Sequence, residues 1–508
     1  MASFIYFGIP IFLSTLFFIK LLLLFFTRFN TNMNLPPSPP SLPIIGHLHL
    51  FKKPLHRTLV NLSEAYGPVF LLRFGVRRVI IVSSHSLVQE CFTKNDINFA
   101  NRPQFSSGKH LSYNYTIIGV APYGEHWRNL RRILTLELFS TTRLQSLTTV
   151  RASEVNALLR LLLHEYNSNE QGGFQKVELK PKFFELVFNV MLRTVAGKRC
   201  SNDKTNEINA RSFLELVEET FAFSGVSNIG DFLPILRLFD FQGVKKKVMK
   251  LEKLWDDHLQ LLINEHRNGC IMNGKEREKT MIDVLLSMQQ ADPDIYPDKT
   301  IKSLIMSPFS AGTDTSAATL EWAMALLLNN PEVLEKMKVE LAIHIGDKRL
   351  IQEEDLSSLP YLNGVLYETL RLYPATPLLL PHESIEDCKL SGLDVPRKTI
   401  LLANVYAIHR DPSIWHDPLK FKPERFLEGG EEKMLLPFGL GRRRCPGEGF
   451  ALRLVPLALG AMIQCFEWKK GEEEVDMEER PGLTMPKAKP LKALYKPHMP
   501  MANVLQQV

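Results

Sequence analysis

One cysteine in this chain has the surroundings of a metal ligand. Cys445 follows three consecutive arginines, Arg442–Arg444, and precedes a Pro-Gly turn, in a loop that begins at Phe438. Guanidinium groups nearby would favour the thiolate, and glycines in the loop would let backbone N–H groups approach the sulfur. A soft anionic sulfur is a ligand for iron or zinc.

The spacing of other possible ligands narrows the choice of metal. A zinc site would need further cysteine or histidine ligands at short spacing, and the sequence has none near Cys445. A single thiolate points instead to haem, whose porphyrin supplies four ligands of its own. Taken alone, the motif is equally compatible with a loop cysteine beside a basic patch.

A second group of residues could handle protons. The segment Ala311–Ser316 sets Asp314 beside Thr315 inside an apolar, helical stretch. Gly312 costs a helix about 1 kcal/mol relative to alanine, so it needs a reason, and room for a ligand against the backbone is one. The acid and hydroxyl could serve general acid catalysis, or could simply cap local backbone groups.

Two nitrogen donors lie together on a predicted helix. Trp127 and Arg131 are four residues apart, so their side chains share one helix face. Such a pair would suit an anionic group. The alternative is a core tryptophan beside a solvated arginine.

The cysteine loop resembles the haem-binding loop of the cytochrome P450 family, Phe-x-x-Gly-x-Arg-x-Cys-x-Gly. Phe438, Gly441, Arg443, Cys445 and Gly447 match this pattern without a departure. The resemblance implies that the cysteine is the axial ligand of haem b (iron protoporphyrin IX), that the glycines shape the loop, and that the arginine pairs with a haem propionate. It also implies a mainly α fold with small β-sheets and an N-terminal transmembrane helix.

Further motifs of this family occur in the family's order. Gly312, Asp314 and Thr315 belong to a stretch similar to its oxygen-activation motif. This resemblance implies that the threonine hydroxyl hydrogen-bonds dioxygen, that the acid helps to deliver protons for O–O cleavage, and that the glycine borders the haem pocket. Trp127 and Arg131 resemble the family's Trp-x-x-x-Arg element, which implies propionate binding.

Three charged residues resemble the support behind the haem. Glu368 and Arg371 match the family's Glu-x-x-Arg pair, and Arg425 matches the arginine of its Pro-Glu-Arg-Phe element, which implies one buried structural network. Taken singly, Glu-x-x-Arg spacing is more typical of a surface helix pair. His382, which follows an apolar stretch, resembles a further propionate donor.

The rest of the chain must hold these residues in place. Its 508 residues are 45% hydrophobic, enough for a large core, and no linker divides them. Residues 4–26 are almost wholly apolar, long enough to cross a bilayer, and lack the flanks of a signal peptide. We therefore expect a transmembrane anchor over residues 1–28, a proline-rich hinge over 29–46 and a haem-binding monooxygenase domain over 47–508.

Hydrophobic periodicity predicts mostly helix beyond the hinge. β-rich runs at Val69–Phe74 and Val79–Val82, separated by Gly75 and Arg77-Arg78, predict a hairpin. Pro308 would remove a bond to the Leu304 carbonyl, so we expect a kink or an early helix break there. The predicted helices lie near residues 126–139, 147–166, 179–198, 209–224, 244–267 and 317–329.

Charge and cysteine usage bear on compartment and partners. The net charge of +6 is modest and spread out, which disfavours nucleic acid as a partner. Six scattered cysteines without disulfide or zinc spacing suit a reducing compartment. Lys20 and Arg28 at the C-terminal end of the anchor place the body in the cytosol. We expect a single-pass protein of the endoplasmic reticulum membrane whose apolar segment Phe232–Leu236 also contacts membrane lipid.

Finer resemblance is to plant microsomal members of the family. Ala407–Pro412, Pro381–Ser384 and Ile463–Trp468 resemble the subfamily with isoflavone 2′- and 3′-hydroxylases and lignan methylenedioxy-bridge enzymes. This implies a monooxygenase that uses O2 and NADPH-derived electrons to hydroxylate or oxidatively bridge a small apolar or phenolic metabolite. Oxidation of a terpenoid or another specialised metabolite is the alternative, and a haem protein that does not activate oxygen is disfavoured by Asp314 and Thr315.

The expected electron donor is NADPH–cytochrome P450 reductase. We expect it to dock on the cysteine side of the haem, because that side offers the short electron route. An acidic flavoprotein would be steered there by positive charge. The residues expected on that face are Arg131, Arg132, Arg442 and Arg444.

Overall fold

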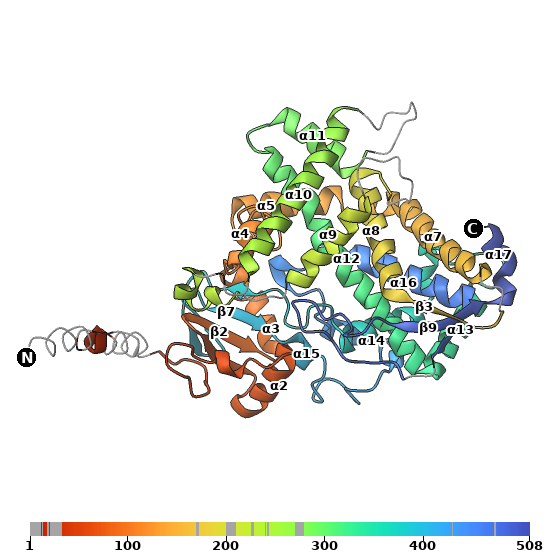
Figure 1. Cartoon of the computed structure of the whole chain (residues 1–508). Helices are drawn as coiled ribbons and strands as arrows, with labels where there is room; N and C mark the ends of the chain where they lie inside the picture. The colour runs from red at the N-terminus through yellow and green to blue at the C-terminus, as the bar shows by residue number, and fades with distance from the viewer. Residues whose placement is uncertain are drawn as a thin grey trace, which may run out of the picture.

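The structure is a computed structural model of the whole chain (Figure 1). It describes Phe12, Ser14–Phe17, Lys20 and residues 33–168, 172–199, 210–224, 228–238, 240, 243–269, 279–428, 430–471 and 474–507. These residues form a mainly helical protein with small sheets, as the sequence predicts. The predicted anchor, residues 1–28, lies almost entirely outside the described residues.

The bounds of the elements follow the chain. The helices are α2 (Leu55–Tyr66), α3 (His85–Phe92), α4 (Ser106–Leu111), α5 (Glu125–Glu137), α6 (Thr141–Ser146), α7 (Thr148–Asn167), α8 (Leu179–Ala196), α9 (Ala210–Ser224), α10 (Val244–Arg267), α11 (Met281–Ala291), α12 (Asp298–Asn329), α13 (Pro331–His344), α14 (Pro360–Leu372), α15 (Val405–Ile408), α16 (Glu448–Cys465) and α17 (Ala502–Gln507). The strands are β1 (Val69–Phe74), β2 (Arg77–Val82), β3 (Gln175–Glu178), β4 (His382–Glu383), β5 (Cys388–Leu390), β6 (Leu393–Val395), β7 (Ile400–Ala403), β8 (Phe466–Lys470) and β9 (Lys492–Pro497).

The largest sheet lies on the side of the molecule that carries α2, away from α17 near the C-terminus (Figure 1). Its order is β1-β2-β7-β4, with β1 and β2 antiparallel and β7 parallel to β2. The predicted hairpin is confirmed, but Arg77 and Arg78 belong to β2, and the turn consists of Gly75 and Val76. Gly75 has φ 55°, and a Cβ there would lie 2.0 Å from the Phe232 carbonyl oxygen, so the turn requires glycine.

The proline-rich segment runs along this sheet. The Leu71 N–H donates to the Pro37 carbonyl at 2.8 Å, and Gly46 forms a β-bridge with Phe74. Pro36 and Pro39 are buried. An extended, stiff segment is what its prolines favour, and its hydrogen bonds fix it to the edge strand β1.

Helix α12 is the centre of the helical body. Most of its residues are buried, and its Phe309 ring packs against Phe188 of α8 (centroids 5.7 Å apart) and Phe213 of α9 (5.0 Å). The helix starts at Asp298 and continues through Pro308, so the expected early break is wrong. Proline removes one backbone bond, and burial of the helix on both sides outweighs that local loss.

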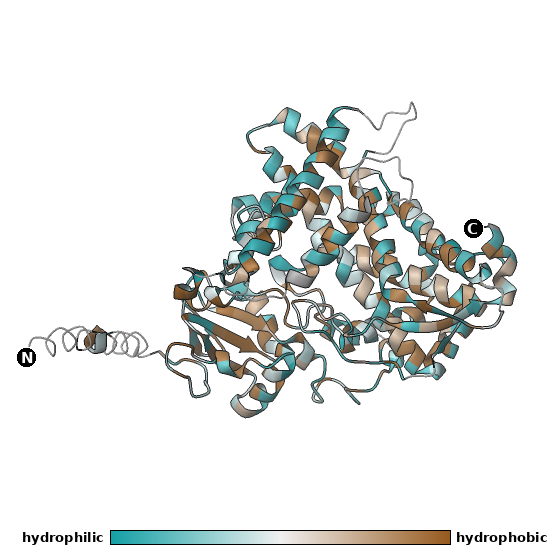
Figure 2. Cartoon of the chain, viewed as in Figure 1, coloured by the Kyte–Doolittle hydropathy of each residue, from teal (hydrophilic) through white to brown (hydrophobic). Residues whose placement is uncertain are grey.

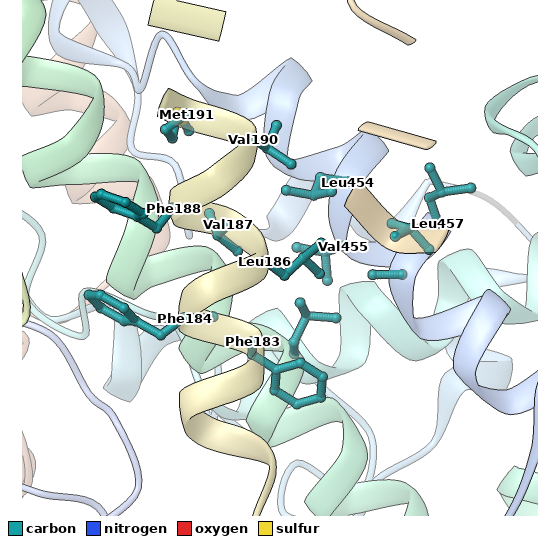
Figure 3. Packing of buried hydrophobic residues seen from close by; sticks show 14 of the residues in the cluster. Phe183, Phe184, Leu186, Val187, Phe188, Val190, Met191, Leu454, Val455 and Leu457 are labelled. Atoms are coloured by element: carbon teal, nitrogen blue, oxygen red, sulfur yellow. The ribbon is translucent and has the colours of Figure 1, made fainter. Parts of the chain in front are cut away.

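The helices that flank α12 share one large apolar core. Figure 3 shows Phe184, Val187 and Met191 of α8 in the same cluster as Leu454 and Leu457 of α16. Hydropathy colouring shows largely brown strands in the main sheet and an outer helix, α10, that carries both teal and brown (Figure 2). The core therefore fixes α8, α12 and α16 relative to each other.

Helix α16 is unusually apolar. Among the described helices it alone is long and apolar enough to cross a membrane, but most of it is buried inside the protein. It is therefore a core helix. It begins three residues after Cys445 and carries the cysteine loop on its N-terminal end.

Candidate functional site

The cysteine loop is a tight turn at the start of α16. The Cys445 N–H donates to the Phe438 carbonyl at 2.9 Å, and Gly447 is the N-cap of the helix. Gly441 has φ 66°, and a Cβ there would lie 2.4 Å from an Asp96 carboxylate oxygen. The loop geometry therefore demands this glycine, and backbone N–H groups at the start of α16 point toward the sulfur side.

The three arginines beside the cysteine have partners other than its sulfur. Arg444 forms a bidentate ion pair with Glu448 (2.6 and 2.7 Å). Arg442 pairs with Asp96 at 3.0 Å. Arg443 donates to three backbone carbonyls. The guanidinium groups of these three arginines therefore form their hydrogen bonds and ion pairs with groups other than the sulfur, and Arg131 on α5 is the cation that favours the Cys445 thiolate.

The ionisation of Cys445 follows from burial. Cys445 keeps exposed surface, and burial of its thiol among the surrounding protein atoms raises the pKa of that thiol. The backbone N–H groups of Gly447 and Glu448 and the charge of Arg131 act in the opposite direction. Protein groups alone therefore do not make this sulfur a thiolate, whereas a metal ion bound to it would, because coordination deprotonates a thiol.

Trp127 and Arg443 form a stacked pair. The Arg443 guanidinium lies 4.4 Å from the centre of the Trp127 ring and donates to the carbonyls of Ala100 and Ala121, each at 2.6 Å. Burial and nearby Arg131 lower the pKa of Arg443 to about 9. The buried Trp127 Nε1 has no hydrogen-bond partner among the described residues. A buried, unpaired N–H beside a buried cation is a site for an anion.

Arg102 belongs to the same cluster, and no motif in the sequence marks it. It is buried and donates from Nη1 to the carbonyls of Leu380 and Pro381, each at 2.8 Å. Its Nε has no partner in the described part of the chain, and burial together with Arg443 holds its pKa well below the usual range. Arg131, whose pKa burial also lowers, donates to the Arg444 carbonyl at 2.5 Å.

His382 lies beside these cations as a neutral imidazole. Its Nδ1 donates to the Phe99 carbonyl at 2.6 Å, and burial, followed by the charges of Arg102 and Arg443, holds its pKa well below the usual range. A neutral ring protonated on Nδ1 can only accept at Nε2. The predicted role of His382 as a propionate donor therefore requires a nearby anion that raises its pKa and charges the ring.

Together these residues fit haem. Three buried or half-buried arginines, an unpaired indole N–H and a neutral histidine gather on one side of the cysteine loop. Buried cations without a carboxylate partner are costly, and the two carboxylates of a haem would remove that cost. The residues that gather there are Arg102, Trp127, Arg131, His382 and Arg443.

Asp314 and Thr315 are neighbours in sequence but point to different surroundings. The Thr315 hydroxyl donates to the Ala311 carbonyl at 2.8 Å, and Ala311 is exposed on a helix that is otherwise mostly buried. Asp314 is buried, its Oδ2 accepts a hydrogen bond from Thr484 Oγ1 at 2.9 Å, and burial raises its pKa. The two side chains therefore act on two faces of α12.

Gly312 serves helix packing. A Cβ at this position would lie 2.5 Å from the Cε of Met191 on α8, a residue labelled in Figure 3. The flexible end of Met191 takes the room beside the missing side chain, so close packing of α8 against α12 is a further reason for this glycine. Any contact between Gly312 and haem stays a prediction.

The predicted charged network is confirmed. The fully buried side chains of Glu368 and Arg371 form a bidentate pair at 2.6 and 2.8 Å, and Arg425 Nε donates to Glu368 at 3.0 Å. Arg371 also donates to the carbonyls of His409 and Pro418. Each of the charges is hydrogen-bonded, which is what makes a buried ionic network tolerable.

His409 connects this network to the cysteine loop, a role that sequence reasoning missed. Its Nδ1 donates to the Arg371 carbonyl at 3.1 Å, and its Nε2 accepts the Leu436 N–H at 2.9 Å. Burial lowers its pKa to about 3, so the ring is neutral and holds one tautomer. Because Leu436 lies two residues before Phe438, the ring ties the start of the loop to Arg371.

Comparison with known proteins agrees with this geometry. The family model of cytochrome P450 matches residues 36–493. The chain is 53% identical to cytochrome P450 81Q32 of Catharanthus roseus, over 94% of this chain and 93% of the relative, and 50% identical to isoflavone 3′-hydroxylase of Medicago truncatula, over 92% and 94%. A zebra fish cytochrome P450 solved with progesterone superposes with a TM-score of 0.73 at 28% identity, covering 88% of this chain and all of that one. The chain therefore belongs to the cytochrome P450 family of haem-containing monooxygenases.

Proposed function

We propose that this enzyme oxidises a plant phenolic, with an isoflavonoid or flavonoid as the first candidate. The observation that carries the proposal is its 50% identity to an isoflavone 3′-hydroxylase over nearly the whole length of both chains. The products in view are a hydroxylated ring or an oxidatively formed bridge. A terpenoid or another specialised metabolite is the alternative substrate.

The chain's own residues would hold haem b as follows. Cys445 would supply a thiolate ligand to the iron, and the turn from Phe438 to Gly447 shapes the surroundings of its sulfur. Trp127 and the gathered arginines and histidine described above would bind the haem carboxylates. When bound, haem supplies the redox chemistry that activates dioxygen.

Thr315 and Asp314 would manage the protons of that chemistry. Thr315 is half-buried, one helical turn after the exposed Ala311, and its hydroxyl can turn from the helix carbonyl toward a reactant. Asp314, with a raised pKa, can hold a proton at its carboxyl and release it. Together they form a proton path that ends at a hydroxyl on the haem side.

Four exposed apolar side chains lie together near the β1–β2 turn and would suit contact with a membrane. Leu42, Ile44, Val76 and Ile235 are 45%, 50%, 60% and 73% exposed, and we call them the apolar edge. The segment of Ile235 meets the β1–β2 turn, since the Val76 N–H donates to the Phe232 carbonyl at 3.0 Å. We propose that residues 1–28 anchor the enzyme in the endoplasmic reticulum membrane with its body in the cytosol, and that the apolar edge rests on the lipid.

The electron donor proposed is NADPH–cytochrome P450 reductase. Of the four arginines expected to meet it, Arg442 and Arg444 are ion-paired within the protein and Arg131 is half-buried. Arg132 is exposed, and the described contact of its guanidinium is a hydrogen bond to Asn129 one turn earlier on α5. The charge offered to an acidic partner therefore centres on Arg132.

The substrate is tested by titration of the ferric haem. Isoflavones, flavones and terpenoids of matched size are added to the purified enzyme, and the Soret shift is followed. Compounds that shift the band are then incubated with reductase, with and without NADPH. Products from an isoflavone only with NADPH support the proposal, whereas turnover confined to terpenoids, or turnover without NADPH, would overturn it.

A further inference from the structure

The carboxyl of Asp314 borders a charged cavity on the side of α12 away from Thr315. The cavity has a volume of about 260 Å³ and joins residues of α8, α9, α12 and the loop between β8 and β9. It is lined by Lys180, Glu215, Glu218, Glu219, Phe221, Asp314 and Arg480. A polar cavity of this size can hold water, so solvent protons can reach this carboxyl.

One neutral side chain holds that carboxyl directly. Thr484 Oγ1 donates to Asp314 Oδ2 at 2.9 Å, and Asp314 is only 6% exposed. The charged groups around the acid act less directly: Lys180 and Arg480 favour the carboxylate, whereas Glu218 opposes it. Glu321, further along α12, is a second buried acid close enough to interact with Asp314.

The hairpin that carries Thr484 is fixed at its tip. The Arg480 N–H donates to the Pro486 carbonyl at 2.8 Å, which closes the hairpin across Thr484. The next residue, Met485, is buried; its N–H donates to the Ala375 carbonyl at 2.9 Å, and its carbonyl accepts the Trp322 Nε1–H at 2.8 Å.

Trp322 and Asp314 lie about two turns apart on α12. The hairpin tip therefore contacts the same helix at two points, once through the Met485 carbonyl and once through the Thr484 hydroxyl. Such a double contact fixes where the hydroxyl sits, because neither end can move without breaking a bond to α12. The fold therefore fixes the position of the Thr484 hydroxyl, and the hydrogen bond from this hydroxyl orients the Asp314 carboxyl.

We propose that Thr484 is a positioning residue for proton delivery: its hydroxyl holds the Asp314 carboxyl in the orientation that connects the charged cavity with the Thr315 side of α12. This inference rests on the proton role proposed above for Asp314. Thr484 itself need not touch substrate or haem. It acts through Asp314, in the same way that the orienting partner of a catalytic acid does.

The central test replaces Thr484 with valine, which keeps the shape and removes the hydroxyl. Because a hydrogen bond to a charged group is among the stronger ones, we expect oxidised product per NADPH to fall about five- to tenfold in Thr484→Val. Thr484→Ser keeps the hydroxyl and should restore most of the coupling. Thr93→Val, an exposed threonine whose hydroxyl donates to the Gln89 carbonyl, should behave as wild type.

A second measurement, independent of turnover, reports the protonation of the Asp314 carboxyl itself. The infrared band of the protonated Asp314 carboxyl, identified by its loss in Asp314→Asn, is titrated with pH. The Thr484 hydroxyl favours the charged form, so its removal should move this titration to higher pH. A hydroxyl that only holds the hairpin would leave the band where it is and lower thermal stability instead.

The outcomes separate this inference from the proton role on which it rests. If Asp314→Asn keeps wild-type coupling, the proposed proton role of Asp314 fails. If Asp314→Asn uncouples the enzyme but Thr484→Val keeps both wild-type coupling and the wild-type infrared titration, only the inference about Thr484 is wrong. Uncoupling and a shifted band in Thr484→Val, both reversed in Thr484→Ser, support it.

Discussion

Two regions of the site differ in the hydrogen-bond partners of their polar groups. One is the charged network behind the cysteine loop, which we call the support, and the other is the side that would face haem and substrate. In the support, Glu368, Arg371 and Arg425 bond one another and backbone carbonyls. On the other side, Trp127 Nε1 has no partner among the described residues, and Thr315 bonds a carbonyl of its own helix. A region whose partners are all protein is complete in the folded chain, whereas a site for haem and oxygen is completed by what binds there.

This difference predicts which changes destroy the fold and which destroy only the chemistry. Substitutions in the support should lower stability before they touch the reaction. Substitutions at the ligand and on α12 should leave the fold in place and change what the bound haem can do. The cysteine itself is the sharpest case.

The largest effect is expected from Cys445→Ser. A serine oxygen is a harder and poorer ligand for haem iron than a thiolate, so the haem-thiolate state and the monooxygenase activity should both disappear. The variant is reduced, treated with carbon monoxide and compared with wild type by its Soret band. A Soret band at the wild-type long wavelength would mean that Cys445 is not the ligand.

The next effect is expected in the support. Arg371→Ala leaves Glu368 buried without its bidentate partner, which should cost about 3–5 kcal/mol in free energy of unfolding and reduce haem retention. Arg349→Ala is the matched control, because Arg349 forms the same bidentate pair with Asp355 at the surface (2.6 and 2.8 Å). The control should cost less than about 1 kcal/mol. Equal losses in thermal or urea unfolding would contradict the distinction between the two regions.

A smaller effect, confined to the chemistry, is expected from Thr315→Ala. Loss of one hydroxyl should let NADPH consumption continue while product per NADPH falls several-fold, up to the ~10²-fold that positioned proton donors contribute, with hydrogen peroxide released instead. Haem content and melting temperature should stay near wild type. Thr319→Ala removes the matching hydroxyl one turn along α12 and serves as control. If the two variants couple equally well, Thr315 is a backbone cap and no more.

The same contrast explains what could be read from the sequence. The i, i+3 spacing of Glu368 and Arg371 predicted that they share a helix face, and the resemblance to family motifs implied their burial and their link to Arg425. The structure confirms the pair, its burial and that link. The length of α12 was not predictable from the sequence, because local propensity at Pro308 argues for a break that tertiary packing overrides.

Partners distant in the sequence were also beyond prediction. Arg102 and Thr484 carry no motif, and the stretch Ala407–Pro412 indicates a subfamily but no role for His409. Each of the three residues acquires its role from a residue 27 or more positions away that only the fold brings near. The closeness of Arg442 and Arg444 to Cys445 in the sequence also did not predict their partners. Arg442 forms an ion pair with Asp96, an acid far away in the chain, and Arg444 forms one with Glu448, one turn along.

The link between the support and the cysteine loop should be sensitive to acid. His409 has a pKa of about 3 in the folded protein and an ordinary value of 6.5 when unfolded. Between these values the unfolded chain binds the extra proton, so stability is lost as the pH falls from about 6.5 toward 3, by up to about 1.4 kcal/mol per pH unit. His409→Gln removes this titration, and its stability should depend less steeply on pH in that window. His416→Gln at the surface is the control, and parallel slopes for wild type and His409→Gln would exclude the effect.

The smallest effect is expected at the surface, where Arg132→Glu should slow reduction of the haem by the reductase. Arg132 is exposed and keeps its charge available, whereas Arg444 is paired with Glu448. The double change Arg444→Gln with Glu448→Gln removes that pair without changing the net charge, so it is a control that should slow reduction less. Steering by one charge changes the association rate a few-fold at low salt, and screening at physiological ionic strength and above should remove most of the difference. Reduction is followed by stopped flow under carbon monoxide across a salt series. If Arg132→Glu slows reduction equally at high salt, Arg132 makes a direct contact at the docked interface instead of steering the partner. If both variants slow reduction equally, internal ion pairs do not decide which arginines the partner meets.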